Sequence, residues 1–142
     1  MLFAPVLPAR AAGSAFFALS ASNPVPAVGD DIKVAVWVNP NGEAIDTVRA
    51  NLSFNPGAVE AIWFDLAPSF PSLSPDYGID NANGTLTFGA YKFGERVTAS
   101  SLLATVTFRT LAAGSATISV DDTSRLITDG VEKIDAETSR AN

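Results

Sequence analysis

The stretch from Val48 to Gly57 reads Val-Arg-Ala-Asn-Leu-Ser-Phe-Asn-Pro-Gly, an alternation of apolar and polar residues that ends in a turn signal. Successive side chains of a strand point to opposite faces of a sheet, so the alternation predicts one buried and one solvated face. The residues expected in the core are Val48, Ala50, Leu52 and Phe54. The strand ends at Asn-Pro-Gly because these residues favour a turn.

The rest of the chain repeats this pattern in short segments that are separated by Gly, Pro and Asn turn signals. The expected strands are 15–21, 32–38, 45–55, 58–66, 85–90, 102–109, 116–120, 125–128 and 131–134. Residues 67–83 are expected to form an ordered loop with room for one short extended segment. About nine strands at spacings of ~8 to 12 residues predict an all-β fold, a two-sheet antiparallel sandwich.

The alternation also assigns the faces of two later strands. Their expected inward residues are Leu86, Phe88, Ala90, Ala104, Val106 and Phe108. By the same period of two, Leu103 is expected to face solvent.

The composition excludes several classes of function. The 142 residues correspond to one domain, and the net charge of −6 opposes binding to nucleic acid, which needs clustered Lys and Arg. The chain has no Cys and no His. It therefore lacks the residues that thiol nucleophiles, His-based triads and typical zinc sites require. The adjacent pair Asp30-Asp31 does not suit glycoside hydrolysis, because neighbours on a strand point to opposite faces. The chain is therefore expected not to be an enzyme.

Two tryptophans raise the question of sugar binding. Trp37 and Trp63 are candidate stacking platforms, but both lie within apolar runs where burial is the usual outcome. We therefore expect them in the core.

The N-terminus allows two interpretations. Residues 1–12 form an apolar run that ends in Ala9-Arg10-Ala11, which is typical of a secretory signal remnant and predicts a secreted protein. The run is far shorter than the ~20 residues that span a bilayer, so no transmembrane segment is expected. Alternatively, a retained apolar strand completes the sheet of a neighbouring copy and builds an extracellular filament. The residues of this alternative are Leu2, Phe3, Val6, Leu7, Phe16 and Phe17.

The loop before residue 85 is rich in Asp and Asn. Asp76 and Asp80 are weak candidates for calcium ligands, but their spacing matches no known calcium loop, so no metal or cofactor is expected. The sequence Asn83-Gly84-Thr85 is a glycosylation sequon in a predicted turn, and Asn83 is the better of two candidate sites.

Several segments together resemble the cohesin family. The matching segments are 26–30, 45–56, 59–61, 83–89, 102–108, 112–118 and 127–130, and they follow one another in the family's order. The resemblance implies a jelly-roll sandwich of about nine strands over residues 13–136, with residues 137–142 as a tail. It also implies a non-catalytic, extracellular or cell-surface module that binds a dockerin-like protein through an exposed sheet face.

The resemblance places the partner at outward positions of three strands. Carried over to this chain, these positions are Thr47, Arg49, Asn51, Ser53, Thr85, Thr87, Thr105 and Thr107. The residues alone leave a second interpretation open, because threonine and serine are common on any solvated strand. What favours a binding face is the small number of charged residues that would discourage another protein from stacking there.

Overall fold

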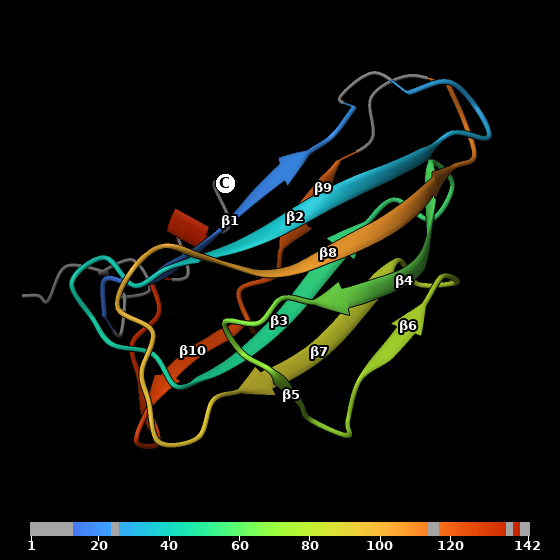
Figure 1. Ribbon diagram of the computed structural model, residues 1–142. Helices are drawn as coiled ribbons and strands as arrows, with labels where there is room; N and C mark the ends of the chain where they lie inside the picture. Colours follow the sequence, from blue (N-terminus) through green and yellow to red (C-terminus); the bar gives the residue numbers. More distant parts are fainter. Residues whose placement is uncertain (1–12, 24–25, 114–116, 136–137, 140–142) are drawn as a thin grey trace, which may run out of the picture.

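Two antiparallel sheets face each other across an apolar core (Figure 1). The structure is a computed structural model that describes residues 13–23, 26–113, 117–135 and 138–139. The four-stranded sheet has the order β1 (Phe16–Ala21), β2 (Asp31–Asn39), β8 (Ser101–Thr110), β4 (Val59–Leu66). The seven-stranded sheet has the order β11 (Val131–Glu132), β10 (Arg125–Thr128), β3 (Thr47–Phe54), β7 (Thr85–Tyr91), β5 (Ser72–Leu73), while β6 (Gly78–Asp80) also pairs with β7 and β9 (Ile118–Val120) with β3.

The all-β jelly-roll sandwich expected from the sequence is confirmed. Nine of the strands correspond to the expected segments, and the other two, β5 and β6, lie in the segment 67–83. That segment contains two short strands rather than one because both ends of it pair with β7. Among the described residues, no helix is long and apolar enough to cross a membrane.

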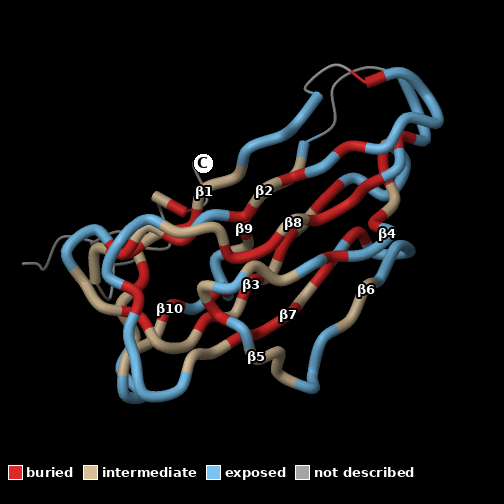
Figure 2. The backbone as a smooth tube through the Cα atoms, in the orientation of Figure 1, coloured by how far each residue is buried: buried red, intermediate tan, exposed pale blue. Residues whose placement is uncertain are grey.

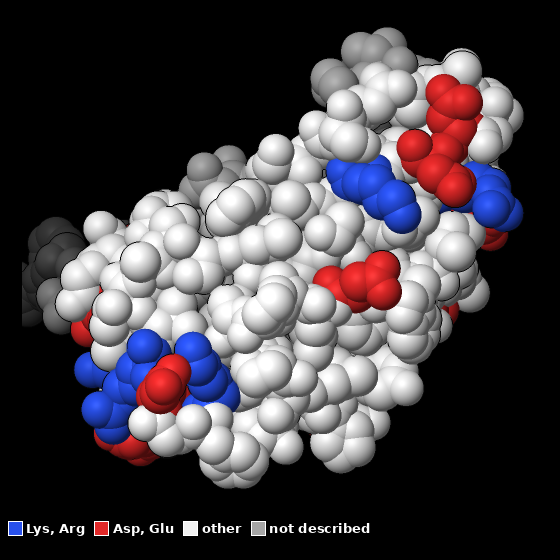
Figure 3. All heavy atoms as spheres, in the orientation of Figure 1, with Lys and Arg blue, Asp and Glu red and all other residues white. Residues whose placement is uncertain are grey.

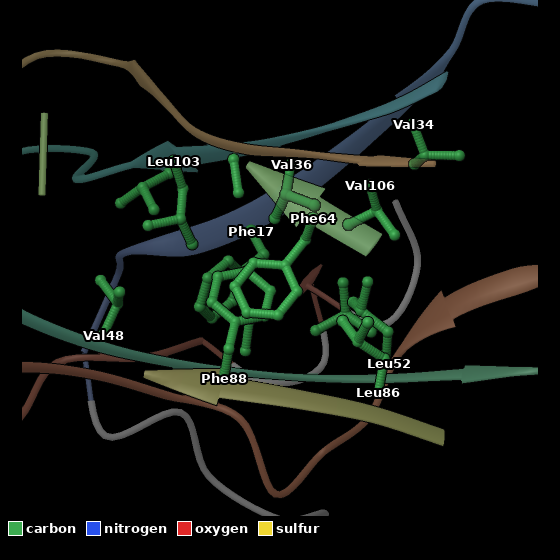
Figure 4. Packing of buried hydrophobic residues seen from close by; sticks show 14 of the residues in the cluster. Phe17, Val34, Val36, Val48, Leu52, Phe64, Leu86, Phe88, Leu103 and Val106 are labelled. Carbon is green, nitrogen blue, oxygen red and sulfur yellow. The ribbon is translucent and has the colours of Figure 1, made fainter. Parts of the chain in front are cut away.

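The core is built by the expected alternation. The side chains of Val48, Ala50, Leu52 and Phe54 are all buried, as are the six residues expected to face inward on β7 and β8. Figure 2 shows that buried positions recur along the strands of both sheets. In the middle of this space the rings of Phe64 and Phe88 are stacked, with centroids 4.6 Å apart (Figure 4).

The expectation that Leu103 faces solvent is wrong, because its side chain is fully buried. Val36 of β2 pairs with Ala104 of β8, and the next residue, Trp37, pairs with Leu102. Leu103 therefore has no partner on β2 and forms a β-bulge, which shifts the alternation by one residue. The bulge turns Leu103 into the core.

The expected burial of the two tryptophans is also wrong. Trp37 is 37% exposed and Trp63 is 46% exposed. Trp37 occupies an outward position of β2, whose residues alternate although the run is almost wholly apolar. On β4 the register shifts between Ala61 and Trp63, which leaves Ile62 without a partner and places Trp63 opposite Thr107 on the outer side. The apolar runs of β2 and β4 therefore each contain an exposed tryptophan that the sequence pattern does not reveal.

The first described strand is part of the chain's own sandwich. Phe16 and Phe17 lie in β1, which pairs with β2 along its whole length, and Phe17 is fully buried. Its backbone N–H donates to Oγ of Ser139, 2.9 Å away, in the short helical turn at 138–139. These two phenylalanines therefore belong to the chain's own four-stranded sheet, in which β1 is an edge strand. The other proposed assembly residues, Leu2, Phe3, Val6 and Leu7, lie outside the described residues, as does the expected signal remnant.

Candidate functional site

The outer face of the seven-stranded sheet holds six of the eight expected partner-binding residues. We call it the β3–β7 face, and its six residues are Thr47, Arg49, Asn51, Ser53, Thr85 and Thr87. Asn51 lies directly opposite Thr87, and Ser53 lies opposite Thr85. All six are half-buried except Thr85, which is exposed, because neighbouring side chains shield one another.

A chain of hydrogen bonds crosses this face from strand to strand. An Nη atom of Arg49 donates to Oγ1 of Thr87 over 3.2 Å, and the Thr87 hydroxyl donates to Oδ1 of Asn51. Nδ2 of Asn51 then donates to Oγ1 of Thr123 at 2.9 Å, and the Thr123 hydroxyl donates to Asp121 at 2.8 Å. The polar side chains therefore hold one another in fixed positions.

A carboxylate lies at each end of this series of hydrogen bonds. Asp76 accepts from Arg49 at 2.6 Å, and this hydrogen bond holds the pKa of the Asp76 carboxyl below its usual range. The backbone N–H and hydroxyl of Thr123, with a smaller contribution from the hydroxyl of Ser53, lower the pKa of Asp121. Both carboxyl groups therefore stay ionised well into the acid range.

A turn between β9 and β10 fixes the centre of the face. Ser124 is fully buried, and its Oγ accepts from the backbone N–H of Asn51 at 3.0 Å and donates to the Asn51 carbonyl at 3.2 Å. This hydroxyl supplies the acceptor that a neighbouring strand would otherwise give to the Asn51 N–H, whereas the Asn51 carbonyl also accepts from the backbone N–H of Asp121 at 2.7 Å. Sequence reasoning did not assign Asp121, Thr123 or Ser124 to the face. The signal was the run Asp-Asp-Thr-Ser, whose side chains readily bond to nearby backbone.

The other two expected residues do not belong to this face. Thr105 and Thr107 lie on β8, in the four-stranded sheet on the opposite side of the sandwich. Thr107 is only 8% exposed, and its hydroxyl accepts from Nζ of Lys33 at 2.7 Å. The expectation that three strands present one row of hydroxyls is wrong, because a local alternation does not say which sheet a strand joins.

The two weak calcium candidates have different partners. Asp76 pairs with Arg49, whereas Asp80 accepts from the backbone N–H groups of Ala82 and Asn83 and from Nδ2 of Asn83. Within the described ranges, no group of three or more acidic, His or Cys side chains is placed to hold a metal ion. Asn83 lies in an exposed turn, and its Nδ2 is 2.7 Å from Asp80.

A charged cleft of about 390 Å³ adjoins one end of the β3–β7 face and is lined by Asp46, Lys92, Gly94, Glu95, Arg96 and Asp129. Each charged side chain has an oppositely charged neighbour, since Arg96 pairs with Asp129 and lies 4.0 Å from Asp46, and Lys92 lies 3.0 Å from Glu95. The cleft therefore offers no unpaired acid or base for catalysis among these lining residues. Beside it, Phe93 is 81% exposed and packs edge-on against Tyr91.

Comparison with known protein families identifies one matching family. The model of the cohesin domain family matches residues 18–141. None of the curated proteins matches the chain significantly.

Solved structures with the same fold cover most of the chain. A cohesin module from a family 33 glycoside hydrolase of Clostridium perfringens is 14% identical, with a TM-score of 0.70 over 85% of this chain and 89% of that one. A type I cohesin–dockerin complex from Clostridium thermocellum is 15% identical, with a TM-score of 0.68 over 90% and 91%. The second type II cohesin module of a cellulosomal adaptor scaffoldin from Acetivibrio cellulolyticus is 18% identical, with a TM-score of 0.64 over 84% and 88%. These likenesses concern the fold.

Proposed function

The chain belongs to the cohesin family, and from that premise we propose that it is a non-catalytic module that binds a dockerin-like protein through the β3–β7 face. Similar solved structures include complexes of cohesin with dockerin. The observation that supports this site most strongly is the hydrogen-bonded row from Arg49 through Thr87 and Asn51 to Thr123. We infer that the module acts outside the cell, because two of these similar structures are named as parts of a cellulosome.

The geometry of the row suits protein recognition. Its side chains are already held in position, so binding costs little additional ordering of the face. Few long or charged side chains project from β3 and β7, which leaves a flat surface for another protein. Ionised Asp121 at one end would attract a partner that presents Lys or Arg, and the net charge of −6 acts in the same direction, whereas the charge of Asp76 is balanced by Arg49.

The proposal is tested by a matched pair of substitutions. Thr87→Tyr places a bulky ring in the centre of the β3–β7 face, and Thr105→Tyr places the same ring on the opposite sheet. Each variant is used to capture partners from the extracellular fraction of the producing organism, with identification by mass spectrometry. The captured partner is then purified and its affinity is measured by calorimetry.

We expect Thr87→Tyr to weaken binding at least tenfold, about 1.4 kcal/mol, whereas Thr105→Tyr binds as the unmodified protein does. The captured partner should carry a dockerin-like module. Equal affinity for all three proteins would rule out the β3–β7 face. Loss of binding in Thr105→Tyr alone would move the interface to the other sheet.

The alternative is a filament subunit that adds its N-terminal strand to the sheet of a neighbouring copy. Phe16 and Phe17 pair within the chain's own sheet, and no described contact favours addition of a strand from another copy.

A further inference from the structure

The outer face of the four-stranded sheet carries aromatic rings of a different character. Its exposed aromatic residues are Trp37 on β2 and Trp63 on β4, and Tyr77 lies beside Trp63 with 42% exposure. We propose that this face, with Trp63 as its main platform, binds an uncharged polysaccharide by stacking sugar rings on the indole. Tyr77 belongs to the loop whose Asp76 pairs with Arg49 of the β3–β7 face, so the platform lies near the edge that joins the two faces. The proposal does not depend on the proposed function.

The Trp63 ring is held from below by a stack of aromatic rings. Phe88 in the core stacks on Phe64, and Phe64 stacks on Trp63 with centroids 5.0 Å apart and an angle of 24° between the rings. Tyr77 packs edge-on against both Phe64 and Trp63. One face of the indole is therefore covered by Phe64, and the ring still keeps almost half of its surface exposed. Such a ring is a pre-organised platform for a flat apolar ligand surface.

Hydrogen-bonding groups lie next to the platform. Thr107 is directly opposite Trp63 in the sheet. The Thr107 hydroxyl accepts a hydrogen bond from Nζ of Lys33 at 2.7 Å, so the ammonium group lies close to the platform. Asp65 follows two residues along β4 and is exposed. A sugar has one apolar ring face and a rim of hydroxyls, so a platform with a carboxylate and an ammonium near its edge matches its chemistry.

Trp37 lies on the same face at a distance. Its partner on β8 is Leu102, whereas the partner of Trp63 is Thr107, and two strand spacings separate β2 from β4. The Cα atoms of the two tryptophans are therefore roughly 15 to 20 Å apart. This separation suits an extended chain of several sugars better than a single small molecule.

The surface between the two tryptophans carries few charges. Ala35, Thr105 and Asp65 lie opposite one another in one row across β2, β8 and β4. Figure 3 shows charged side chains gathered toward the two ends of the molecule, with a single acidic group in the wide uncharged area between them. A neutral ligand fits this distribution of charge better than a strongly charged protein partner would.

The test measures retention on three named polysaccharides. The intact protein is incubated with amorphous cellulose, xylan and chitin, and bound and free protein are separated by centrifugation. We expect retention on at least one of them and a loss of more than tenfold in affinity for Trp63→Ala. Trp63→Phe keeps an aromatic platform and should retain part of the binding. Trp37→Ala should lose less than Trp63→Ala.

Two controls make the outcome specific. Phe93→Ala removes an exposed aromatic side chain elsewhere on the surface and should bind normally, and Thr87→Tyr should also bind normally. Circular dichroism and thermal unfolding establish that each variant is folded. Absence of retention on all three polysaccharides, or undiminished retention of a folded Trp63→Ala, would overturn the proposal. Because Thr87→Tyr affects only the protein partner, failure here is distinct from failure of the proposed function.

Discussion

The two outer faces of the sandwich differ in how their side chains are held. On the β3–β7 face, small polar side chains are fixed laterally by hydrogen bonds that run across strands. On the four-stranded sheet, Trp63 is fixed from below by a stack of rings that continues into the core. The first arrangement gives a flat polar surface, and the second gives an exposed aromatic platform.

This difference shows that one core pattern supports two kinds of outer surface. Inward positions on both sheets are apolar and buried. Outward positions carry no such constraint, so each face has its own chemistry. The two sheets turn these outer faces in opposite directions, and the loop at Asp76 and Tyr77 contacts both Arg49 and Trp63.

The largest change in the free energy of unfolding is expected where the aromatic platform meets the core. Phe64→Ala removes the middle ring of the stack, and a buried Phe→Ala substitution costs about 3 to 5 kcal/mol in the free energy of unfolding. Urea denaturation measures this loss, and the fluorescence of Trp63 should shift to longer wavelength as the ring gains water. The control Phe93→Ala removes an exposed ring and should cost less than about 0.5 kcal/mol. Equal costs would mean that the stack does not support the platform.

The next largest change in the free energy of unfolding is expected at the centre of the β3–β7 face. Ser124→Ala leaves the backbone N–H of Asn51 without its partner, which costs about 1 to 3 kcal/mol in the free energy of unfolding. The exposed Ser100→Ala is the matched control, with an expected change within about 0.5 kcal/mol. A stability of Ser124→Ala equal to that of the control would show that the buried hydroxyl does not organise this face.

A smaller effect is expected within the polar row. Asn51→Ala and Thr123→Ala, alone and combined, form a double-mutant cycle whose coupling energy should be about 0.5 to 1 kcal/mol. The pair Asn51→Ala and Thr105→Ala, on opposite sheets, should show no coupling. Thermal or urea unfolding of all variants gives both values. Coupling of equal size in the two pairs would contradict a hydrogen-bonded row confined to one face.

The smallest change in stability is expected from a change of pH. The folded protein lowers the pKa of Asp76 and Asp121 below the ordinary value of 3.8, so unfolding is accompanied by proton uptake in acid. Their contribution to stability is fully present above about pH 5 and is lost as the pH falls through the depressed folded pKa values. Since the chain has no His, the melting temperature should be nearly constant from about pH 5.5 to 8. Asp76→Asn should lose less stability than the unmodified protein between about pH 4 and 2.

The sequence predicted the core of the sandwich well. The strict alternation from Val48 to Phe54 is sufficient to assign β3, because its period of two survives folding without interruption. On β8 the same reasoning failed at Leu103, since a bulge depends on the strand it pairs with and not on the local pattern.

The candidate site was predicted only in part. The outward residues of β3 and β7 were identified, but Thr105 and Thr107 were placed with them because sheet membership is decided by pairing between distant segments. Ser124 and Thr123 contact Asn51 across more than seventy residues of sequence, which no local pattern records. Trp37 and Trp63 were expected in the core because an apolar run does not reveal which of its residues point outward.

Binding of the protein partner to the β3–β7 face is tested most directly by one nuclear magnetic resonance titration. Uniformly ¹⁵N-labelled protein gives side-chain signals for Nδ2 of Asn51 and Nε of Arg49 on that face, and for the indole N–H groups of Trp37 and Trp63 on the other. On addition of the purified partner, we expect the signals of Asn51 and Arg49 to shift while both indole signals stay in place. Shifts of the indole signals with unchanged Asn51 and Arg49 would contradict the claim.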